Sequence, residues 1–193
     1  MLYRKAYDRL LTWKGQPKRK ALCVMGARQI GKTTLIRQFG KEQYSCFVEV
    51  NFITDTDATK IFAGNLDANT IITNLTAYTR KPMIPRNTLV LLDEIQACPN
   101  ARTAIKFLVE DGRFDYIESG SLLGVRHKEV RSYPVGFEEL YQMYPMDLEE
   151  YLWANGVQKS TIQYLKDCYE TGTPVTDAIH QTMCKLLYSY IVV

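Results

Sequence analysis

The sequence has no long uninterrupted hydrophobic run, and this absence excludes several classes of protein. Its apolar segments span only a few residues, whereas a membrane-spanning helix needs about 20. Residues 1–5 also lack the apolar stretch of a secretory signal. We therefore expect a cytoplasmic protein that is neither exported nor inserted in a membrane.

Cysteine and histidine are scarce and scattered. The chain has 5 cysteines and 2 histidines, no CxxC pair, and no histidine near a ligand-like cluster. A disulfide framework uses paired cysteines, and zinc sites use closely spaced ligands. Neither a disulfide-stabilised fold nor a zinc site is expected.

Acidic residues are almost absent from the first 41 residues. This segment has eleven Lys or Arg and one acid, Asp8, whereas the rest of the chain has 13 bases and 20 acids. Such a basic N-terminal third can attract nucleic acid or an acidic protein partner. A solvated basic face is the alternative, because no aromatic interleaving accompanies the charges. The charges ahead of the first motif are Lys14, Lys18, Arg19 and Lys20.

One short segment of the sequence does contain a specific motif. Residues 26–33 read GARQIGKT, which matches the phosphate-binding pattern GxxxxGKT. Residues 21–25 before it are typical of a buried strand, and residues 33–40 after it predict a helix that ends at Gly40. Strand, glycine-rich loop and helix therefore occur in the order that the pattern requires.

The residue types in this loop suit a nucleoside triphosphate with Mg²⁺. Gly26 and Gly31 permit backbone conformations in which N–H groups point at phosphate oxygens, next to the positive end of the helix. Lys32 is expected to reach the β and γ phosphates, and the Thr33 hydroxyl to bind Mg²⁺. The expected nucleotide-binding residues are Gly26, Ala27, Arg28, Gln29, Ile30, Gly31, Lys32, Thr33 and Thr34.

A second apolar run, residues 88–92, ends in two acids, Asp93 and Glu94. A buried parallel strand delivers such acids to the carboxyl edge of the sheet, where the phosphates are also expected. Asp93 is then a metal ligand, directly or through water, and Glu94 orients the attacking water. Considered alone, the pair also fits a solvated strand end. Together with the loop, it predicts hydrolysis as well as binding.

Two serines stand at the end of the next expected strand, residues 114–119. Ser119 and Ser121 would lie at the same sheet edge, where a hydroxyl can bond the γ-phosphate or the attacking water. We therefore count both as candidate catalytic residues, beside Lys32 and Glu94. An ordinary Ser-Gly turn fits the spacing nearly as well.

Strands and helices alternate along the chain, which predicts an α/β fold with a parallel sheet covered on both faces. An amphipathic helix is expected within residues 1–13. Further strands are expected at 44–52 and 140–144, and helical segments at 55–63, 68–79 and 100–110.

The last quarter of the sequence is helical in pattern. Asp147 and Glu150 predict a capping box for a helix at 147–155, and two more helices are expected at 160–170 and from 174 onward. The chain stops inside an apolar segment, residues 186–193, without the residues that usually close a helix. We expect a P-loop core at 1–145, with its N-terminal helix, and at 146–193 the start of a truncated C-terminal region. Alternatively, the last residues complete a finished domain.

Five segments together resemble a known family: GARQIGKTT, LVLLDEIQACPNA, ESGSLLGV, SYPVG and MYPMDLEEYLWANG. They are similar to AAA+-like ATPases of bacteria and archaea, in which an ATPase domain of the additional-strand, catalytic-glutamate type precedes a C-terminal region. The resemblance implies a three-layer P-loop fold, ATP rather than GTP, and a chain that continues past Val193. It also implies that the strand ending at Ser119 separates the loop strand from the Asp93 strand.

One departure from the family concerns the arginine finger. Members often carry a basic residue after the glycine equivalent to Gly136, where this chain has Phe137. Arg126 and Arg131 are weak alternatives. A finger from a second subunit can raise the rate by about 10³ to 10⁵, so a homo-oligomer is expected to hydrolyse ATP faster than a slow isolated monomer.

Three functions compete on these residues. The leading one is an Mg²⁺-dependent ATPase. The second is a module in which ATP switches a DNA or protein contact and hydrolysis is incidental, which the basic N-terminal third favours. A small-molecule kinase fits worse, because a kinase must avoid a water-activating glutamate.

Overall fold

The computed structural model describes residues 2–121 and 134–192. Contacts within the chain divide it into two units, one of Ala6–Tyr144 and one of Met1–Lys5 with Pro145–Val193. Within the described residues, no helix is both long and apolar enough to cross a membrane. The functional boundary expected after residue 145 stays a prediction.

The larger unit contains a five-stranded sheet in which all neighbouring strands are parallel. The strand order is β2-β3-β4-β1-β5, so β4 lies between β1 and β3. This order confirms the place that the family resemblance implied for the strand with Ser119. The strands are β1 (Ala21–Gly26), β2 (Cys46–Asn51), β3 (Thr88–Asp93), β4 (Asp115–Ser121) and β5 (Glu138–Gln142).

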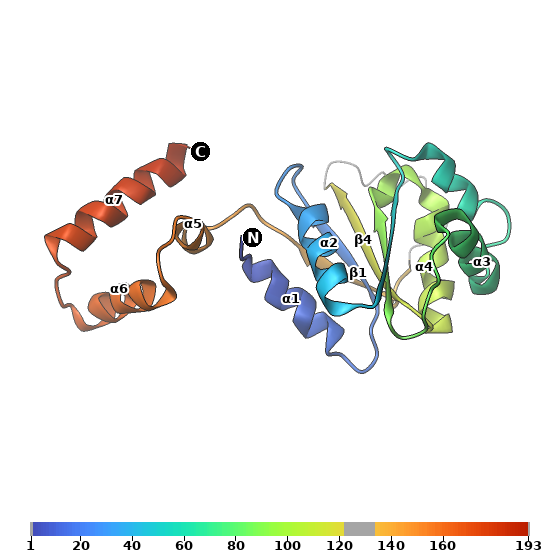
Figure 1. The fold of residues 1–193 in the computed structure, drawn as a ribbon, viewed down its shortest axis with the longest axis horizontal. Coiled ribbons are helices and arrows are strands. Elements are labelled where there is room, and N and C mark those ends of the chain that lie inside the picture. Colours follow the sequence, from blue (N-terminus) through green and yellow to red (C-terminus); the bar gives the residue numbers. More distant parts are fainter. Residues whose placement is uncertain (1, 122–133, 193) are drawn as a thin grey trace. The chain divides into compact units, whose positions relative to one another are not determined.

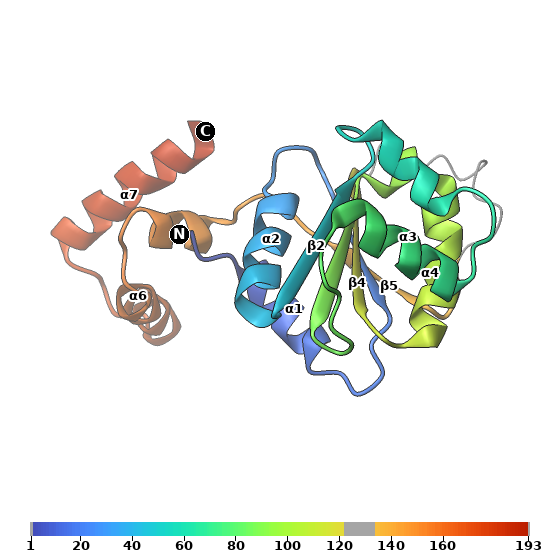
Figure 2. The ribbon, with the colours of Figure 1, turned by 45° about the vertical axis from the view of Figure 1, so that its right-hand side comes forward.

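Helices cover both faces of this sheet, as Figure 1 and Figure 2 show. Helices α1 and α2 pack on one face, and α3 and α4 pack on the other. The three-layer α/β fold expected from the sequence is therefore confirmed. The helical segments are α1 (Lys5–Lys14), α2 (Lys32–Gln43), η1 (Thr56–Phe62), α3 (Ala68–Thr79), η2 (Ile95–Ala97) and α4 (Pro99–Asp111).

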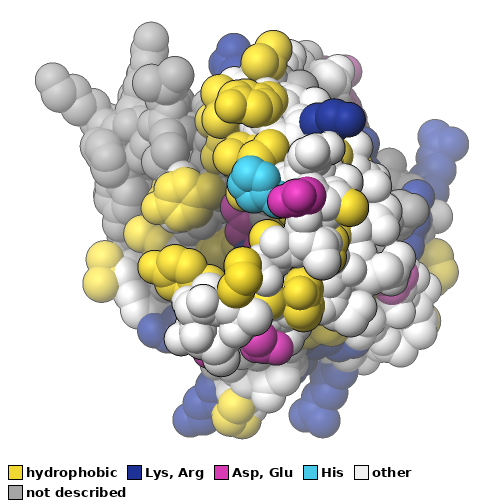
Figure 3. Space-filling view, turned by 90° about the vertical axis from the view of Figure 1, so that its left-hand side faces the viewer, with side chains coloured by type: hydrophobic (Ala, Val, Ile, Leu, Met, Phe, Trp, Pro, Cys, Tyr) yellow, Lys and Arg dark blue, Asp and Glu magenta, His cyan; other side chains and the backbone are white. Residues whose placement is uncertain are grey.

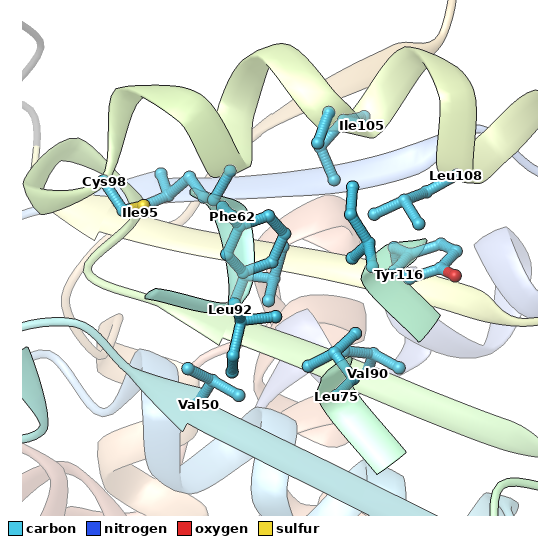
Figure 4. Close-up of a cluster of buried hydrophobic side chains, with 14 of the residues drawn as sticks. Val50, Phe62, Leu75, Val90, Leu92, Ile95, Cys98, Ile105, Leu108 and Tyr116 are labelled. Carbon is cyan, nitrogen blue, oxygen red and sulfur yellow. The ribbon is translucent and has the colours of Figure 1, made fainter. Parts of the chain in front are cut away.

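Alternate residues of β3 face the two helical layers. Leu89 and Leu91 pack with side chains of α1 and α2. Val90 and Leu92 pack with those of α3 and α4, among the side chains drawn in Figure 4. All four are fully buried. Burial on both faces explains why this strand is a continuous apolar run rather than an alternating one.

Helix α2 does not end at Gly40, as the sequence pattern predicted. It runs to Gln43, and Tyr44 is its C-cap. Gly40 is buried against the ring of Phe47 in β2, and a Cβ added to it would lie 2.3 Å from Phe47 Cδ2. The glycine therefore permits close contact between helix and strand instead of ending the helix.

Strand β5 lies two residues earlier than the expected 140–144. Its first residues are Glu138 and Glu139, which an apolar pattern does not include. Arg102 of α4 donates hydrogen bonds to both carboxylate oxygens of Glu138, at 2.8 and 3.0 Å, and Arg9 pairs with Glu139. These ion pairs let two acids occupy the start of an edge strand.

The described part of the smaller unit consists of three helices and residues 2–5. The capping box predicted for Asp147 and Glu150 is present at the start of α5. The buried Glu150 carboxylate also accepts from the backbone N–H of Lys5 at 2.6 Å and pairs with Arg4. The helices are α5 (Leu148–Ala154), α6 (Lys159–Thr171) and α7 (Asp177–Val192).

Helix α7 has no buried residue. Tyr188 and Ile191 are 71% and 68% exposed. Figure 3 views the side of α6 and α7 and shows hydrophobic side chains gathered there. The apolar segment that ends the sequence is thus a helix whose apolar side chains remain largely exposed.

Candidate functional site

The predicted phosphate loop joins the end of β1 to the start of α2. Gly31 is the N-cap of α2 with φ 90°, and Gln29 also has a positive φ of 64°. The left-handed conformation at Gly31 is one that glycine adopts without strain. Gln29 and Gly31 thus both have left-handed backbone conformations, and the loop leads into the N-terminus of α2. The first N–H groups of a helix have no partner within the helix.

Gly26 has a different role from Gly31. A Cβ added to Gly26 would lie 2.4 Å from the carbonyl oxygen of Met143 and 2.7 Å from Ile30 Cδ1. The Met143 N–H also donates to the Met25 carbonyl at 2.7 Å, which holds the segment after β5 against the loop. Glycine is required at this position because another backbone approaches it closely.

Lys32 lies folded over the loop. Its side chain is buried, and its Nζ donates to the carbonyl oxygens of Gly26 at 3.0 Å and Ala27 at 2.7 Å. Burial lowers the pKa of Lys32. The carboxylates of Glu94 and Asp93 oppose this effect. The charge of Lys32 is therefore held beside the acids at the end of β3.

Asp93 is the residue on which the site converges. It is 2% exposed, and the Thr33 hydroxyl lies 3.2 Å from both of its carboxylate oxygens. Asn51 Nδ2 donates to Oδ2 at 2.8 Å, and the Ser119 hydroxyl donates to Oδ1. Three strand ends and one helix start thus meet at a single carboxylate.

The oxygens of Thr33 and Asp93 fit a magnesium ion. Mg²⁺ prefers oxygen ligands at 2.0–2.1 Å in octahedral geometry, so neighbouring ligand oxygens lie about 3 Å apart. The observed separation of 3.2 Å agrees with this spacing. Together, the hydroxyl and the carboxylate can provide two adjacent ligands.

Glu94 turns out of the strand toward the loop. Its backbone is left-handed, with φ 56° and ψ 47°, a conformation that a non-glycine residue adopts rarely and at some cost. Its carboxylate accepts a hydrogen bond from Gln96 Nε2. With loop residues, Glu94 lines a cavity of about 400 Å³, whose other lining residues are Arg28, Gln29, Gly31, Lys32, Thr33 and Thr34.

The two candidate serines occupy different places. Ser119 is buried and bonded to Asp93, which makes it a support for that carboxylate. Ser121 pairs with Gly26 in the register of β4 and β1, at the loop end of the strand. Its buried hydroxyl has no hydrogen-bond partner among the described residues. Arg126 and Arg131, the weak finger candidates, lie outside the described residues.

Sequence reasoning missed two residues of this site, Asn51 and Gln96. Asn51 is the last residue of β2, and β2 pairs with β3 so that Asn51 lies beside Asp93. The sequence signal for Asn51 was a polar residue near the end of an expected strand. Gln96 gave no signal, because its contact with Glu94 depends on the left-handed turn between them.

A second buried polar cluster lies on the α4 face of the sheet. Ligand atoms of Cys23, Glu118 and Glu138 lie within 4.8 Å of one another. Glu118 is fully buried, and its carboxylate oxygens accept no hydrogen bond from the described residues. Burial raises the pKa of Glu118, the charge of Glu138 raises it further, and Arg102 opposes both.

Comparison with protein families gives a match over most of the chain. Residues 18–152 match a family model described as AAA domain. No curated protein sequence matches.

Solved structures give matches to the fold. The Drosophila ORC bound to DNA is 17% identical with a TM-score of 0.50, and the match covers 83% of this chain and 48% of that one. The ORC1 protein of Aeropyrum pernix in complex with DNA is 17% identical with a TM-score of 0.48, covering 81% and 50%. This chain thus spans about half the length of these structures. At such identities the first match supports the fold alone.

Proposed function

Because this chain belongs to the AAA domain family, we propose that it binds ATP with Mg²⁺ and hydrolyses it to ADP and phosphate. The convergence of Thr33, Asp93 and Glu94 on one side of the phosphate loop carries this proposal. The loop and the helix N-terminus provide an anion site, and Asp93 and Thr33 provide two adjacent oxygen ligands for the metal. The cavity that Thr33 and Glu94 line with the loop is where a γ-phosphate and a water would lie.

Each residue then has a defined part in the reaction. Lys32 exchanges its loop carbonyls for phosphate oxygens and stabilises the charge that develops there. Mg²⁺ held by Thr33 and Asp93 would neutralise part of the charge on the β and γ phosphates. Glu94, held by Gln96, orients a water whose oxygen attacks the γ-phosphorus. The bond from that phosphorus to the β–γ bridging oxygen breaks, ADP leaves with the bonding electrons, and the water's proton passes to the Glu94 carboxylate and then to solvent.

Two variants test this proposal. Lys32→Ala should lose ATP binding, because it removes the cation that faces the β and γ phosphates. Glu94→Gln should bind ATP with unchanged Kd and release phosphate about 10² to 10⁴ times more slowly. Glu110→Gln, an exposed acid of α4, is the matched control. Normal turnover by Glu94→Gln would refute the assigned role.

We also propose that hydrolysis depends on assembly. No arginine of the described residues is in the cavity besides Arg28, which belongs to the loop itself. A finger supplied by a second copy would make the specific rate rise with protein concentration. If the rate of ATP hydrolysis per protein molecule is high in a monomeric sample and constant over a hundredfold range of protein concentration, a finger from a second copy is excluded.

The second candidate function is a nucleotide-gated binding module. The Drosophila ORC, which has a similar fold, is bound to DNA in its structure, and this chain has a basic N-terminal third. ATP would then switch a DNA contact, and hydrolysis would be incidental. A salt titration of DNA binding with and without ATP tests this function. Absence of binding at low salt in both conditions would exclude DNA as the partner.

A further inference from the structure

A second pocket opens at the edge of the sheet opposite to the phosphate loop. It has a volume of about 710 Å³, and its lining includes the first residues of β1 and β4 and the residues just before β5. The phosphate loop follows the other end of β1. Because a six-residue strand spans about 20 Å, the two sites are separate. The volume is within the range of small-molecule sites.

Three cations line this pocket without a partner in the described part of the chain: Lys18, Lys20 and Arg86. All three side chains are exposed. Asp115 is the one acid among the described lining residues. Its Oδ1 accepts from Arg19 Nε at 2.8 Å and its Oδ2 from the Tyr44 hydroxyl at 2.8 Å. Since Arg19 balances Asp115, three positive charges remain for a ligand.

Aromatic side chains complete the lining. Phe114 is almost fully buried and Phe137 is half-buried, so Phe137 keeps part of its ring accessible. Lys106 lies 5.8 Å from the centroid of the Phe137 ring. A half-buried ring in the lining of a basic pocket can stack on a nucleobase while cations hold the phosphate.

We propose that this basic pocket binds a nucleotide unit, with the phosphate on Lys18, Lys20 and Arg86 and the base on Phe137. The unit comes either from a free nucleotide or from single-stranded nucleic acid. This inference goes beyond the proposed ATPase activity and does not depend on it. It also gives the second candidate function a specific location.

The test uses the full chain carrying Lys32→Ala, so that the phosphate loop does not contribute to binding. Fluorescence anisotropy measures the binding of a labelled single-stranded DNA 10-mer and of a labelled mononucleotide at several salt concentrations. The pocket variant adds Lys18→Gln and Lys20→Gln. The matched control adds Lys41→Gln and Lys185→Gln, which remove the same charge from exposed sites on α2 and α7.

The pocket variant should bind at least about tenfold more weakly at low salt, and its slope of log K against log salt should shrink by about 1.4. Binding of the oligonucleotide alone assigns the unit to nucleic acid, and binding of the mononucleotide alone assigns it to a free nucleotide. Either result supports the pocket if the pocket variant binds the probe more weakly and the matched control variant does not. Equal losses in both variants, or no binding of either probe, would overturn the proposal.

Phe137→Leu separates the base contact from the charge contact. It should weaken binding but leave the salt slope unchanged, because a ring contact releases no counterions. Circular dichroism establishes that each variant is folded. Unchanged affinity in a folded Phe137→Leu variant would refute the base contact.

Discussion

Asn51 at the end of β2 donates a 2.8 Å hydrogen bond from its side chain to Oδ2 of Asp93 at the end of β3. The two residues are directly paired in the register of the parallel strands. Asn51 therefore helps to orient the carboxylate that lies 3.2 Å from the Thr33 hydroxyl.

Asn51→Ala should weaken Mg²⁺ binding, so that phosphate release requires a higher Mg²⁺ concentration. Without the amide, Oδ2 of Asp93 loses the donor that orients it, although the Ser119 hydroxyl still holds Oδ1. Residues that orient metal ligands typically change affinity or activity about 10- to 100-fold. Phosphate release measured over a range of Mg²⁺ concentrations checks this prediction. Asn65→Ala, at an exposed position before α3, is the control. An equal Mg²⁺ requirement in the two variants would contradict the role of Asn51.

Gly26→Ala should destabilise the fold as well as the loop. The added Cβ would meet the Met143 carbonyl oxygen at 2.4 Å, and overpacking of this kind costs about 1–3 kcal/mol. Urea unfolding gives the change in the free energy of unfolding. The nearest atom to a Cβ on Gly15 is at 3.5 Å, so Gly15→Ala should change this free energy little. If the two substitutions have the same effect, the close approach at Met143 is not a constraint.

Stability should fall as the pH rises toward 8. Burial raises the pKa of Glu118 to about 8, so the folded state holds a proton that the unfolded state releases above its ordinary value of 4.5. The stabilisation is therefore complete below about pH 4.5 and is lost as the pH rises through about 8. One such proton gives a slope of at most about 1.4 kcal/mol per pH unit.

Glu118→Gln tests this dependence, because the amide stays neutral. Its free energy of unfolding should vary less between pH 5 and pH 8 than that of the unmodified protein. Glu170→Gln, at an exposed position of α6, controls for the loss of a carboxylate. A pH dependence that survives Glu118→Gln unchanged would assign the proton to another group.

Asp147→Ala should destabilise the start of α5. The substitution removes the acceptor for the Glu150 N–H at 2.8 Å and the ion pair with Lys5, and loss of an N-cap typically costs about 0.5–2 kcal/mol. Hydrogen exchange of the α5 amides measures the effect locally. Asp167→Ala, within α6, should leave these amides unchanged. Unaltered exchange in both would show that the capping box contributes nothing measurable.

Much of the fold follows from patterns within a few residues. Helix α3 occupies the range predicted for it, and the buried β3 was visible as an apolar run. The exceptions have tertiary causes. Gly40 continues its helix because Phe47 packs on it, and β5 starts with two acids because arginines of other elements neutralise them.

The sequence by itself determined the phosphate loop, the acidic end of β3 and the alternation of strands and helices, because each depends on neighbouring residues and on backbone preferences. The tertiary structure decided which distant residues meet. It placed Asn51 beside Asp93, Glu118 beside Glu138, and Phe137 beside the early lysines, where the sequence shows no aromatic interleaving. The physical reason is the order of the parallel strands, which sets the neighbours of every strand end and leaves no local signal in the chain.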